Sequence, residues 1–315
     1  MKDKILLAGS SGYVGSCIKR SIEGKFDLIE TQREKTGFNQ IQLNEKQCQE
    51  IDKSTKVVII SLGSTELDSD SYIKSVESSI NTIACLIDRH KKDIPKAKII
   101  YISTFQVYGE YEGLISEETL ASPKNTYAIV HYMTELLLNQ YCTQNNVQLC
   151  ILRPTNIYGT NDICFPFRRK TLVPNCFINE AFKSKIITIK SQDRVFRDFI
   201  NVKDLTEIVH KIIRDLIRNK PIPVIINICS GNTLEILEIA KKTQTVFNEL
   251  MQKDIEVVTP NMKKEILEKD FKSSLSVKSI YLESLDWEYN NSKDIERELI
   301  NLIQMYNYNR KDYHV

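Results

Sequence analysis

Short apolar segments alternate with amphipathic segments along the first half of the chain. The apolar segments have the length of β-strands, and the amphipathic ones repeat their apolar positions every three to four residues, as helices do. The apolar segments are KILLAG, DLIETQ, VVIISLG and KIIYIS. One amphipathic segment begins after Gly12, and another runs from Ser71 to His90. Strand and helix in regular alternation predict a parallel sheet with helices on both faces, which is a doubly wound α/β fold.

The second half of the chain continues this pattern with more interruptions. Its predicted elements are, in order, a helix from about Asn125 to Asn145, a buried strand VQLCILRP, a loop-rich stretch from Tyr158 to Pro174, a helix near Cys176 to Lys185, a short strand IITIK, the segment DFINVKDL leading into a helix, a strand VIINIC, and further helices. Because VIINIC occurs so late, we expect two interleaved lobes. We place the doubly wound domain at residues 1–160 plus about 199–229, and a smaller C-terminal α/β lobe at residues 161–198 and 230–315.

A glycine-rich turn follows the first predicted strand. The segment GSSGYVG has Gly9, Gly12 and Gly15 between this strand and the mouth of a helix. Glycine allows a sharp turn and a close approach of backbone N–H groups to a pyrophosphate, which the positive end of the helix also favours. The arrangement predicts a dinucleotide site. The predicted cofactor contacts in this turn are Gly9, Ser11, Gly12, Tyr13, Val14 and Gly15.

The end of the second predicted strand bears on the choice between NAD(H) and NADP(H). An acidic residue there accepts hydrogen bonds from the ribose hydroxyls and repels a 2′-phosphate. Our alignment puts Gln32 at this position and Arg33 after it, and an arginine suits a phosphate. We therefore expect NADP(H) rather than NAD(H), with Arg33 as a cofactor contact. A shift of the alignment by two residues would bring in Glu30, and NAD(H) would then be favoured.

Composition and charge narrow the class of partner. The 315 residues include 43 basic and 41 acidic side chains and carry a net charge of +2, so no strong field for a nucleic acid is present. No apolar run reaches the roughly 20 residues of a membrane helix, and the N-terminal apolar segment is too short for a signal peptide. The eight cysteines show no spacing typical of a metal site. We expect a cytoplasmic protein with a small-molecule partner, no bound metal, and no membrane or nucleic-acid partner.

Three further segments carry a family resemblance. They are ISTFQVYG (102–109), YAIVH (127–131) and ILRPTNIYG (151–159). Their order and spacing resemble those of the extended short-chain dehydrogenase/reductases, the superfamily of nucleotide-sugar epimerases, dehydratases and reductases. The resemblance covers nearly the whole chain. It implies a Rossmann domain for the cofactor, a C-terminal lobe for a nucleotide sugar, and a homodimer formed by the helices at 71–90 and 125–145.

The resemblance also implies roles for individual residues. Thr104 takes the place of the Ser/Thr that hydrogen-bonds the reacting oxygen, Tyr127 that of the acid/base tyrosine, and His131 that of a lysine. The implied catalytic residues are therefore Thr104, Tyr127 and His131. Besides the glycine turn and Arg33, the implied cofactor contacts are Leu62, Gly63, Ser64, Tyr127, His131 and Pro154. The implied substrate contacts are Thr104, Phe105, Asn156 and Arg197, of which Arg197 resembles the arginine that holds the nucleotide diphosphate.

Two departures from the family pattern bear on the reaction. The 4,6-dehydratases carry an Asp-Glu pair directly after the catalytic Ser/Thr, whereas this chain has Phe105 and Gln106, so we expect no dehydration. A lysine ammonium about 4 Å from the tyrosine would stabilise its phenolate by roughly 4 kcal/mol at an effective dielectric constant near 20. A histidine is shorter and mostly uncharged at neutral pH, so most of this effect is lost with His131.

The loss of the ammonium favours one direction of the reaction. Oxidation of an alcohol needs Tyr127 deprotonated, whereas reduction of a ketone needs it protonated, which an ordinary phenol is. We therefore expect NADPH-dependent reduction of a nucleotide-linked 4-keto sugar. Two alternatives stay open. One is an NAD-dependent nucleotide-sugar 4-epimerase, and the other is a catalytically inactive dinucleotide-binding protein in which His131 marks lost chemistry.

Overall fold

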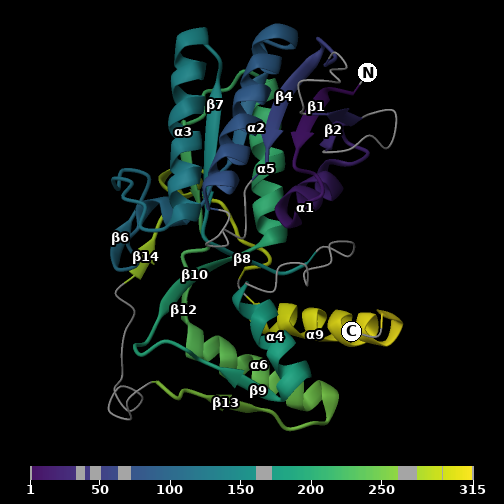
Figure 1. Ribbon diagram of the computed structural model, residues 1–315, viewed down its shortest axis with the longest axis vertical. Coiled ribbons are helices and arrows are strands. Elements are labelled where there is room, and N and C mark those ends of the chain that lie inside the picture. Colours follow the sequence, from purple (N-terminus) through teal and green to yellow (C-terminus); the bar gives the residue numbers. More distant parts are fainter. Residues whose placement is uncertain are drawn as a thin grey trace.

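A parallel sheet of seven strands forms the upper half of the molecule in Figure 1. The computed structural model describes residues 2–32, 40–42, 51–62, 72–160, 172–261, 275–292 and 294–313. Within these residues the strand order is β11-β7-β5-β4-β1-β2-β3, and all neighbouring strands run parallel. The strands are β1 (Lys4–Ala8), β2 (Asp27–Gln32), β3 (Gln40–Gln42), β4 (Thr55–Ile60), β5 (Lys98–Ile102), β7 (Leu149–Pro154) and β11 (Ile225–Ile228). The strand order changes direction between β1 and β4, which confirms the predicted doubly wound fold.

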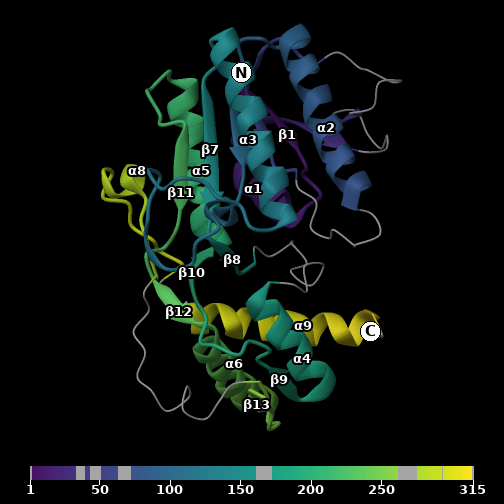
Figure 2. The ribbon, with the colours of Figure 1, turned by 60° about the vertical axis from the view of Figure 1, so that its left-hand side comes forward.

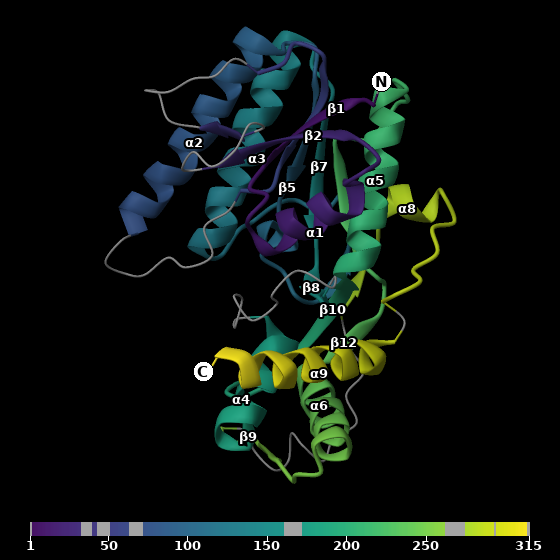
Figure 3. The same ribbon diagram turned by 90° about the vertical axis from the view of Figure 1, so that its right-hand side faces the viewer.

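Helices cover both faces of this sheet, as Figure 3 shows. The covering helices are α1 (Tyr13–Ile22) and α5 (Val202–Ile217) on one face, and α2 (Tyr72–Asp93) and α3 (Thr126–Asn145) on the other. Alternate residues of β1 belong to two separate cores. Ile5 and Leu7 pack with α1 and α5, whereas Leu6 and Ala8 pack with α2 and α3. A strand that is buried on both faces explains why this segment is continuously apolar.

Helix α3, which carries YAIVH, begins and ends at clear sequence signals. The Asn125 side-chain oxygen accepts a hydrogen bond from the Ala128 backbone N–H at 2.9 Å and so caps the first turn. At the other end Asn146 adopts a left-handed conformation with φ of 53°, which terminates the helix.

Among the described helices, none combines the length and the apolar character that a membrane span requires.

A second group of elements forms the lower half of the molecule in Figure 1. Its strands are β8 (Asn156–Tyr158), β10 (Phe196–Asn201) and β12 (Thr233–Glu235) in one sheet, and β9 (Ile186–Thr188) and β13 (Glu256–Val258) in another. Its helices are α4 (Val173–Ser184), α6 (Ile236–Met251) and α9 (Ile295–Tyr313), which share one apolar core. The chain leaves the lower sheet through β10, enters α5, completes the upper sheet with β11 and then returns. The two halves are interleaved, while the lobe boundaries given above stay a prediction.

Four short elements lie along one side of the molecule. They are the 3₁₀-helix η2 (Phe105–Tyr108), the strands β6 (Gly113–Ile115) and β14 (Leu275–Val277), and helix α8 (Ile280–Glu283). Strands β6 and β14 pair in parallel, and their buried residues share a small core with η2. Helix α8 lies beside β11 at the edge of the large sheet (Figure 2).

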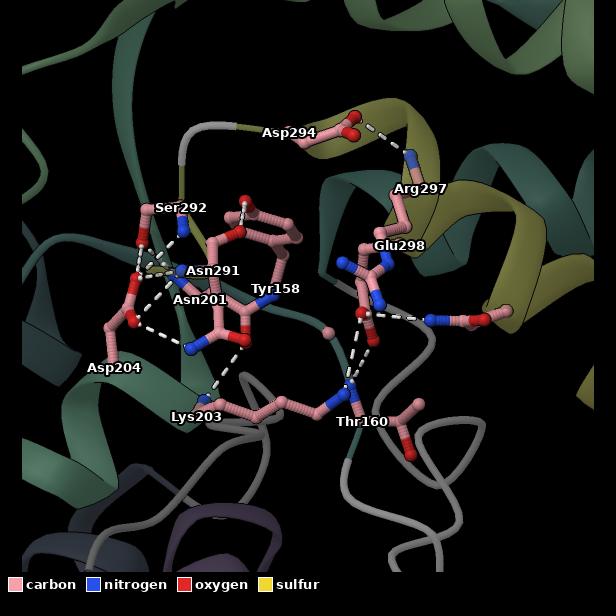
Figure 4. Close-up of polar contacts among 12 residues, drawn as sticks. Tyr158, Thr160, Asn201, Lys203, Asp204, Asn291, Ser292, Asp294, Arg297 and Glu298 are labelled. Carbon is pink, nitrogen blue, oxygen red and sulfur yellow. Dashed lines mark hydrogen bonds and ion pairs between the residues drawn. The ribbon is translucent and has the colours of Figure 1, made fainter. Parts of the chain in front are cut away.

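Hydrogen bonds tie the C-terminal segment to the start of α5, as Figure 4 shows. The fully buried carboxylate of Asp204 accepts hydrogen bonds from the backbone N–H of Asn291 and from the N–H and hydroxyl of Ser292. The Ser292 hydroxyl oxygen in turn accepts from the backbone N–H of Asn201 at 2.9 Å. On α9, Glu298 accepts from the backbone N–H of Thr160 at 2.8 Å. These contacts fix the ends of β8 and β10 against the C-terminal helix, next to the carboxyl edge of the large sheet.

Candidate active site

The glycine turn after β1 is sterically restricted at two of its three glycines. Gly9 has a φ of +89°, and a β-carbon there would lie 2.3 Å from the carbonyl oxygen of Ser61. A β-carbon on Gly15 would lie 2.0 Å from the carbonyl oxygen of Gly9. At Gly12 the nearest atom would be 3.4 Å away, an ordinary contact. Gly9 and Gly15 are therefore required by the chain's own packing, whereas Gly12 leaves open backbone surface.

The amino end of α1 suits an anion. Its N-cap, Gly12, makes no side-chain cap hydrogen bond, and the first turn contains no acidic residue. Helix α5 differs, because Asn201 caps it and Asp204 lies in its first turn. The uncapped N–H groups and the helix dipole at α1 fit the pyrophosphate of a dinucleotide. The residues present therefore fit the cofactor that the sequence predicts.

The other residues predicted to contact the cofactor in this turn differ in the exposure of their side chains. Ser11 is exposed, while Tyr13 and Val14 are buried. The Tyr13 hydroxyl donates a hydrogen bond to the carbonyl oxygen of Gly159 at 2.5 Å, and Val14 belongs to the core. A cofactor contact of Tyr13 or Val14 would therefore come from the backbone.

Glu30 on β2 is already paired. Its carboxylate lies 2.7 Å from the ammonium of Lys19 on α1, and its partner in the sheet register is Leu7. Strand β2 continues to Gln32, so Gln32 and not Glu30 occupies the carboxyl end of the strand.

Four other predicted cofactor contacts follow the ends of β2 and β4. Arg33, Gly63 and Ser64 lie outside the described residues, and Leu62 packs beside the core next to Gly9.

Thr104 and Tyr127 lie on two segments that contact each other. Thr104 follows β5 and caps η2, because its hydroxyl oxygen accepts from the backbone N–H of Gln106 at 3.3 Å. Tyr127 is the second residue of α3 and is half-buried. The Asn125 side-chain N–H donates to the side-chain oxygen of Gln106 at 2.9 Å, which links the starts of η2 and α3. The structure therefore brings the segments of Thr104 and Tyr127 together at the carboxyl edge of the sheet.

His131 lies against Tyr127 on the same face of α3, as the spacing predicts. The two ring centroids are 4.5 Å apart at an interplanar angle of 62°. His131 is buried, with 4% of its surface exposed. Its Nδ1 lies 2.7 Å from the hydroxyl of Tyr101 on β5. Complete burial raises the pKa of Tyr101 well above its ordinary value, so this phenol keeps its proton.

A buried ion pair next to this group was not anticipated from the sequence. Arg153 on β7 makes two hydrogen bonds to the carboxylate of Glu135 on α3, at 2.6 and 3.1 Å. The hydroxyl of Ser103, which directly precedes Thr104, also donates to Glu135. The Arg153 guanidinium lies 4.7 Å above the ring of Tyr108 in η2. Charges buried in this way hold β5, β7, η2 and α3 in one arrangement.

The predicted substrate residues lie where the upper sheet meets the lower lobe. The predicted cofactor contact Pro154 ends β7 there, and the side chain of the predicted substrate contact Asn156 donates to the carbonyl oxygen of Asp198 at 3.0 Å. Burial raises the pKa of Asp198, whose carboxylate accepts a hydrogen bond from Thr155 at 2.6 Å. The side chain of Phe105 is buried near Tyr108, and its contact with a substrate stays a prediction.

Arg197 is a half-buried cation with an aromatic partner. Its guanidinium lies 4.0 Å above the ring of Tyr111 and donates to the carbonyl oxygen of Phe196 at 2.8 Å. Burial lowers the pKa of Arg197. Among the described residues no carboxylate forms an ion pair with it, whereas Arg194 is paired with Glu235. A desolvated guanidinium of this kind is suited to an anionic ligand.

Comparison with known proteins adds family information. The model for the NAD dependent epimerase/dehydratase family matches residues 5–229. A GDP-6-deoxy-D-talose 4-dehydrogenase from Aggregatibacter actinomycetemcomitans is 26% identical over 250 residues, which are 75% of this chain and 77% of the relative.

Solved structures share the fold at low sequence identity. A UDP-glucose 4-epimerase superposes with a TM-score of 0.76 at 20% identity, over 97% of this chain and 98% of its own. A dTDP-glucose 4,6-dehydratase from Bacillus anthracis, in complex with NAD, superposes with a TM-score of 0.71 at 17% identity, over 98% and 97% of the two chains. These similarities show the fold.

Proposed function

Because the chain belongs to the NAD-dependent epimerase/dehydratase family of nucleotide-sugar enzymes, we propose that it reduces a nucleotide-linked 4-keto sugar with Tyr127 as the proton donor. A reduced dinucleotide held at the glycine turn and the amino end of α1 would supply the hydride, with its two electrons, that the carbonyl carbon needs. As the C=O π bond breaks, the oxygen takes the hydroxyl proton of Tyr127, and the product is the alcohol. Thr104 hydrogen-bonds the same oxygen. Tyr127 then recovers a proton from water, directly or through His131.

The observation that carries this proposal is the buried imidazole against the Tyr127 ring. An ammonium at this position would stabilise the phenolate and so favour oxidation. An imidazole, mostly uncharged at neutral pH, leaves the phenol protonated, which is the state that reduction consumes. The Asp-Glu pair that dehydration needs is replaced by buried Phe105 and by Gln106, whose side chain is bound to Asn125.

The position of Arg197 supports a substrate that carries a nucleotide diphosphate. The guanidinium is stacked on Tyr111 and has no acidic partner among the residues described. A pyrophosphate would supply the missing negative charge and accept hydrogen bonds from the guanidinium edge. Asn156 on the neighbouring strand β8 pairs in register with Phe199, so the two predicted substrate residues lie on adjacent strands.

For the cofactor we propose NADP(H). Gln32 ends β2 without a negative charge, and the nearest acid on that strand, Glu30, is occupied by Lys19. A 2′-phosphate would therefore meet no repelling carboxylate from β2, and Arg33 follows directly in sequence. The related Bacillus anthracis structure contains NAD, and NAD(H) is the alternative. Replacing Arg33 with alanine should weaken NADPH binding far more than NADH binding; equal effects on both would refute this choice.

We also propose a homodimer formed through α3, with α2 beside it. One face of α3 exposes Ile129, Met133, Leu136 and Leu137, each at least 37% exposed. Their spacing puts them on a single stripe of the helix. A continuous apolar stripe on a surface helix is unfavourable in water unless another surface covers it, and a second copy of α3 would do so.

A 4-epimerase is the second candidate, because a UDP-glucose 4-epimerase shares the fold across nearly the full length of both chains. An epimerase oxidises before it reduces and therefore regenerates its dinucleotide in each cycle. A panel of UDP-, GDP- and dTDP-linked sugars separates the candidates when it is offered in the 4-keto form with NADPH or NADH and in the 4-hydroxy form with NAD. Net loss of the reduced nicotinamide supports the reductase. Interconversion of 4-hydroxy epimers without net loss supports the epimerase.

The Tyr127→Phe variant should abolish turnover and retain cofactor binding. Tyr132→Phe, which removes a phenol from the next turn of the same helix, serves as the matched control and should keep wild-type activity. Activity in Tyr127→Phe would remove this residue from its proposed role. Intact cofactor binding with no turnover of any substrate by the wild type would favour the catalytically inactive alternative.

A further inference from the structure

The hydrogen bond between Tyr101 and His131 connects β5 with the helix that carries Tyr127. Tyr101 is 1% exposed and lies on the face of β5 that packs against α3. Its hydroxyl is 2.7 Å from Nδ1 of His131, and the two rings are stacked at an interplanar angle of 27°, with centroids 5.8 Å apart. The imidazole thus lies in contact with two phenols, Tyr101 and Tyr127.

The chemistry of the two groups decides which atom donates. The Tyr101 phenol keeps its proton because burial raises its pKa well above the ordinary value. A neutral imidazole has one protonated and one acceptor nitrogen, and its acceptor nitrogen is a stronger base than a hydroxyl oxygen. Donation from Tyr101 to Nδ1 therefore leaves the imidazole proton on Nε2. That N–H is the donor His131 can offer to Tyr127 or to the nicotinamide ribose.

Thr134 allows Tyr101 to keep its hydrogen bond with His131 when the imidazole is protonated. The Thr134 hydroxyl donates to the carbonyl oxygen of Val130 at 3.0 Å, and its oxygen also interacts with Tyr101. If His131 gains a proton, both of its nitrogens become donors. Tyr101 can then accept from Nδ1 and turn its own proton toward Thr134. Rotation of one hydroxyl thus keeps the ring in place while its charge changes.

A second Tyr–His pair in the same domain shows what a purely structural pair looks like. Nδ1 of His90 is 2.7 Å from the Tyr141 hydroxyl, and its Nε2 is 2.8 Å from the carbonyl oxygen of Ala97. Both ring nitrogens are used within the fold. Tyr141 lies 14 residues beyond Tyr127 on α3, about 21 Å along the helix. The pair at His90 is therefore a matched control for the pair at His131.

We propose that Tyr101 is a positioning residue that holds His131 against Tyr127 and keeps the imidazole proton on Nε2. This role, which rests on the proposed function, gives His131 a fixed orientation in the place where the family has a lysine. Tyr101 itself touches neither the substrate nor the cofactor in this scheme. It acts through His131 alone.

Nitrogen NMR of the unliganded protein tests the positioning without any need for activity. The chain has four histidines, so ¹⁵N-histidine labelling gives a spectrum that single His→Gln variants can assign. In the wild type, Nδ1 of His131 should be the hydrogen-bonded acceptor and Nε2 the protonated nitrogen. Tyr101→Phe should move the Nδ1 resonance of His131 toward that of a nitrogen without a donor and leave His90 unchanged. Tyr141→Phe should do the reverse.

Single-turnover reduction tests the consequence for catalysis. Tyr101→Phe should slow hydride transfer by about fivefold, the factor that corresponds to one hydrogen bond of about 1 kcal/mol, with KM for the sugar nucleotide unchanged. Tyr141→Phe should leave the rate at the wild-type value. A general loss of fold quality would instead affect both variants and KM as well.

Three results would overturn the role of Tyr101. They are a proton on Nδ1 of neutral His131 in the wild type, an unchanged His131 spectrum in Tyr101→Phe, and a wild-type hydride-transfer rate in that variant. If the wild type reduces none of the substrates offered, the proposed function fails and the spectra alone decide the positioning. A change at His131 in Tyr101→Phe, absent in Tyr141→Phe, would then still support it.

Discussion

Replacing His131 with lysine should restore the charge that the site lacks and lower the pKa of Tyr127. The Tyr127 and His131 ring centroids are 4.5 Å apart, and we take about 4 Å as the distance from a lysine ammonium at position 131 to the phenolate oxygen. At an effective dielectric constant near 20, one unit charge at that distance stabilises the phenolate by about 4 kcal/mol, or about three pKa units. Burial of the new ammonium offsets part of this gain, because a buried cation is itself disfavoured.

We therefore expect the pKa of Tyr127 to fall by about one to two units in His131→Lys. The sign follows from the charge: a cation stabilises the deprotonated phenol. The rate of alcohol oxidation should reach its plateau at a pH lower by the same amount. The rate of ketone reduction should begin to fall at a correspondingly lower pH.

Two assays measure this shift. One is the pH dependence of single-turnover oxidation and reduction. The other is the phenolate absorbance difference between His131→Lys and the double variant His131→Lys/Tyr127→Phe. Gln140→Lys adds the same charge to an exposed position of α3 and should leave both profiles unchanged. If His131→Lys gives wild-type profiles, the imidazole is not coupled to Tyr127, and the argument for reduction loses its basis.

Three further predictions concern other parts of the site. Arg197→Ala should raise KM for the nucleotide sugar by roughly ten- to a hundredfold, because a charge-assisted contact of about 1.5–3 kcal/mol is lost. The affinity for the cofactor should stay unchanged. An unchanged KM would rule out a contact between Arg197 and the diphosphate. Gly15→Ala should lower the melting temperature, since its β-carbon would lie 2.0 Å from the Gly9 carbonyl oxygen, whereas Gly12→Ala should fold normally and bind the dinucleotide more weakly, as titration calorimetry would show. Equal melting temperatures for these two variants would contradict the steric argument. Leu136→Glu should yield a monomer in sedimentation velocity if α3 forms the dimer, and Lys124→Glu, away from the stripe, should not.

The sequence was sufficient for features that depend on local spacing. The glycines of the first turn, the alternation of strands and helices, and the placement of Tyr127 and His131 on one helix face all follow from short periodicities, and the structure agrees with each. The helix predicted from about Asn125 to Asn145 agrees with α3 (Thr126–Asn145). These features involve residues within a few positions of one another.

The contacts that hold the site depend on residues far apart in the chain. Tyr101 and His131 are 30 positions apart, and Glu135 and Arg153 are 18 apart. Tyr101 appears in the sequence as one more apolar strand residue, because its hydroxyl gains meaning only when α3 packs on β5. Strand alternation could have indicated that Tyr101 faces a covering helix, but not which residue it meets. In the sequence, Arg153 likewise looks like an ordinary charged residue near the end of a strand. Its role becomes clear only from the ion pair with Glu135 on α3.

The most direct test of the central claim follows the hydride itself. The protein is incubated with a nucleotide-linked 4-keto sugar and NADPH carrying deuterium at the transferable position of nicotinamide C4, and the product is analysed by mass spectrometry and NMR. The account predicts one deuterium at sugar C4, one oxidised cofactor per product, and no product from Tyr127→Phe with its cofactor bound. An alcohol product without deuterium at sugar C4, no alcohol product at all, or the same yield from Tyr127→Phe would contradict it.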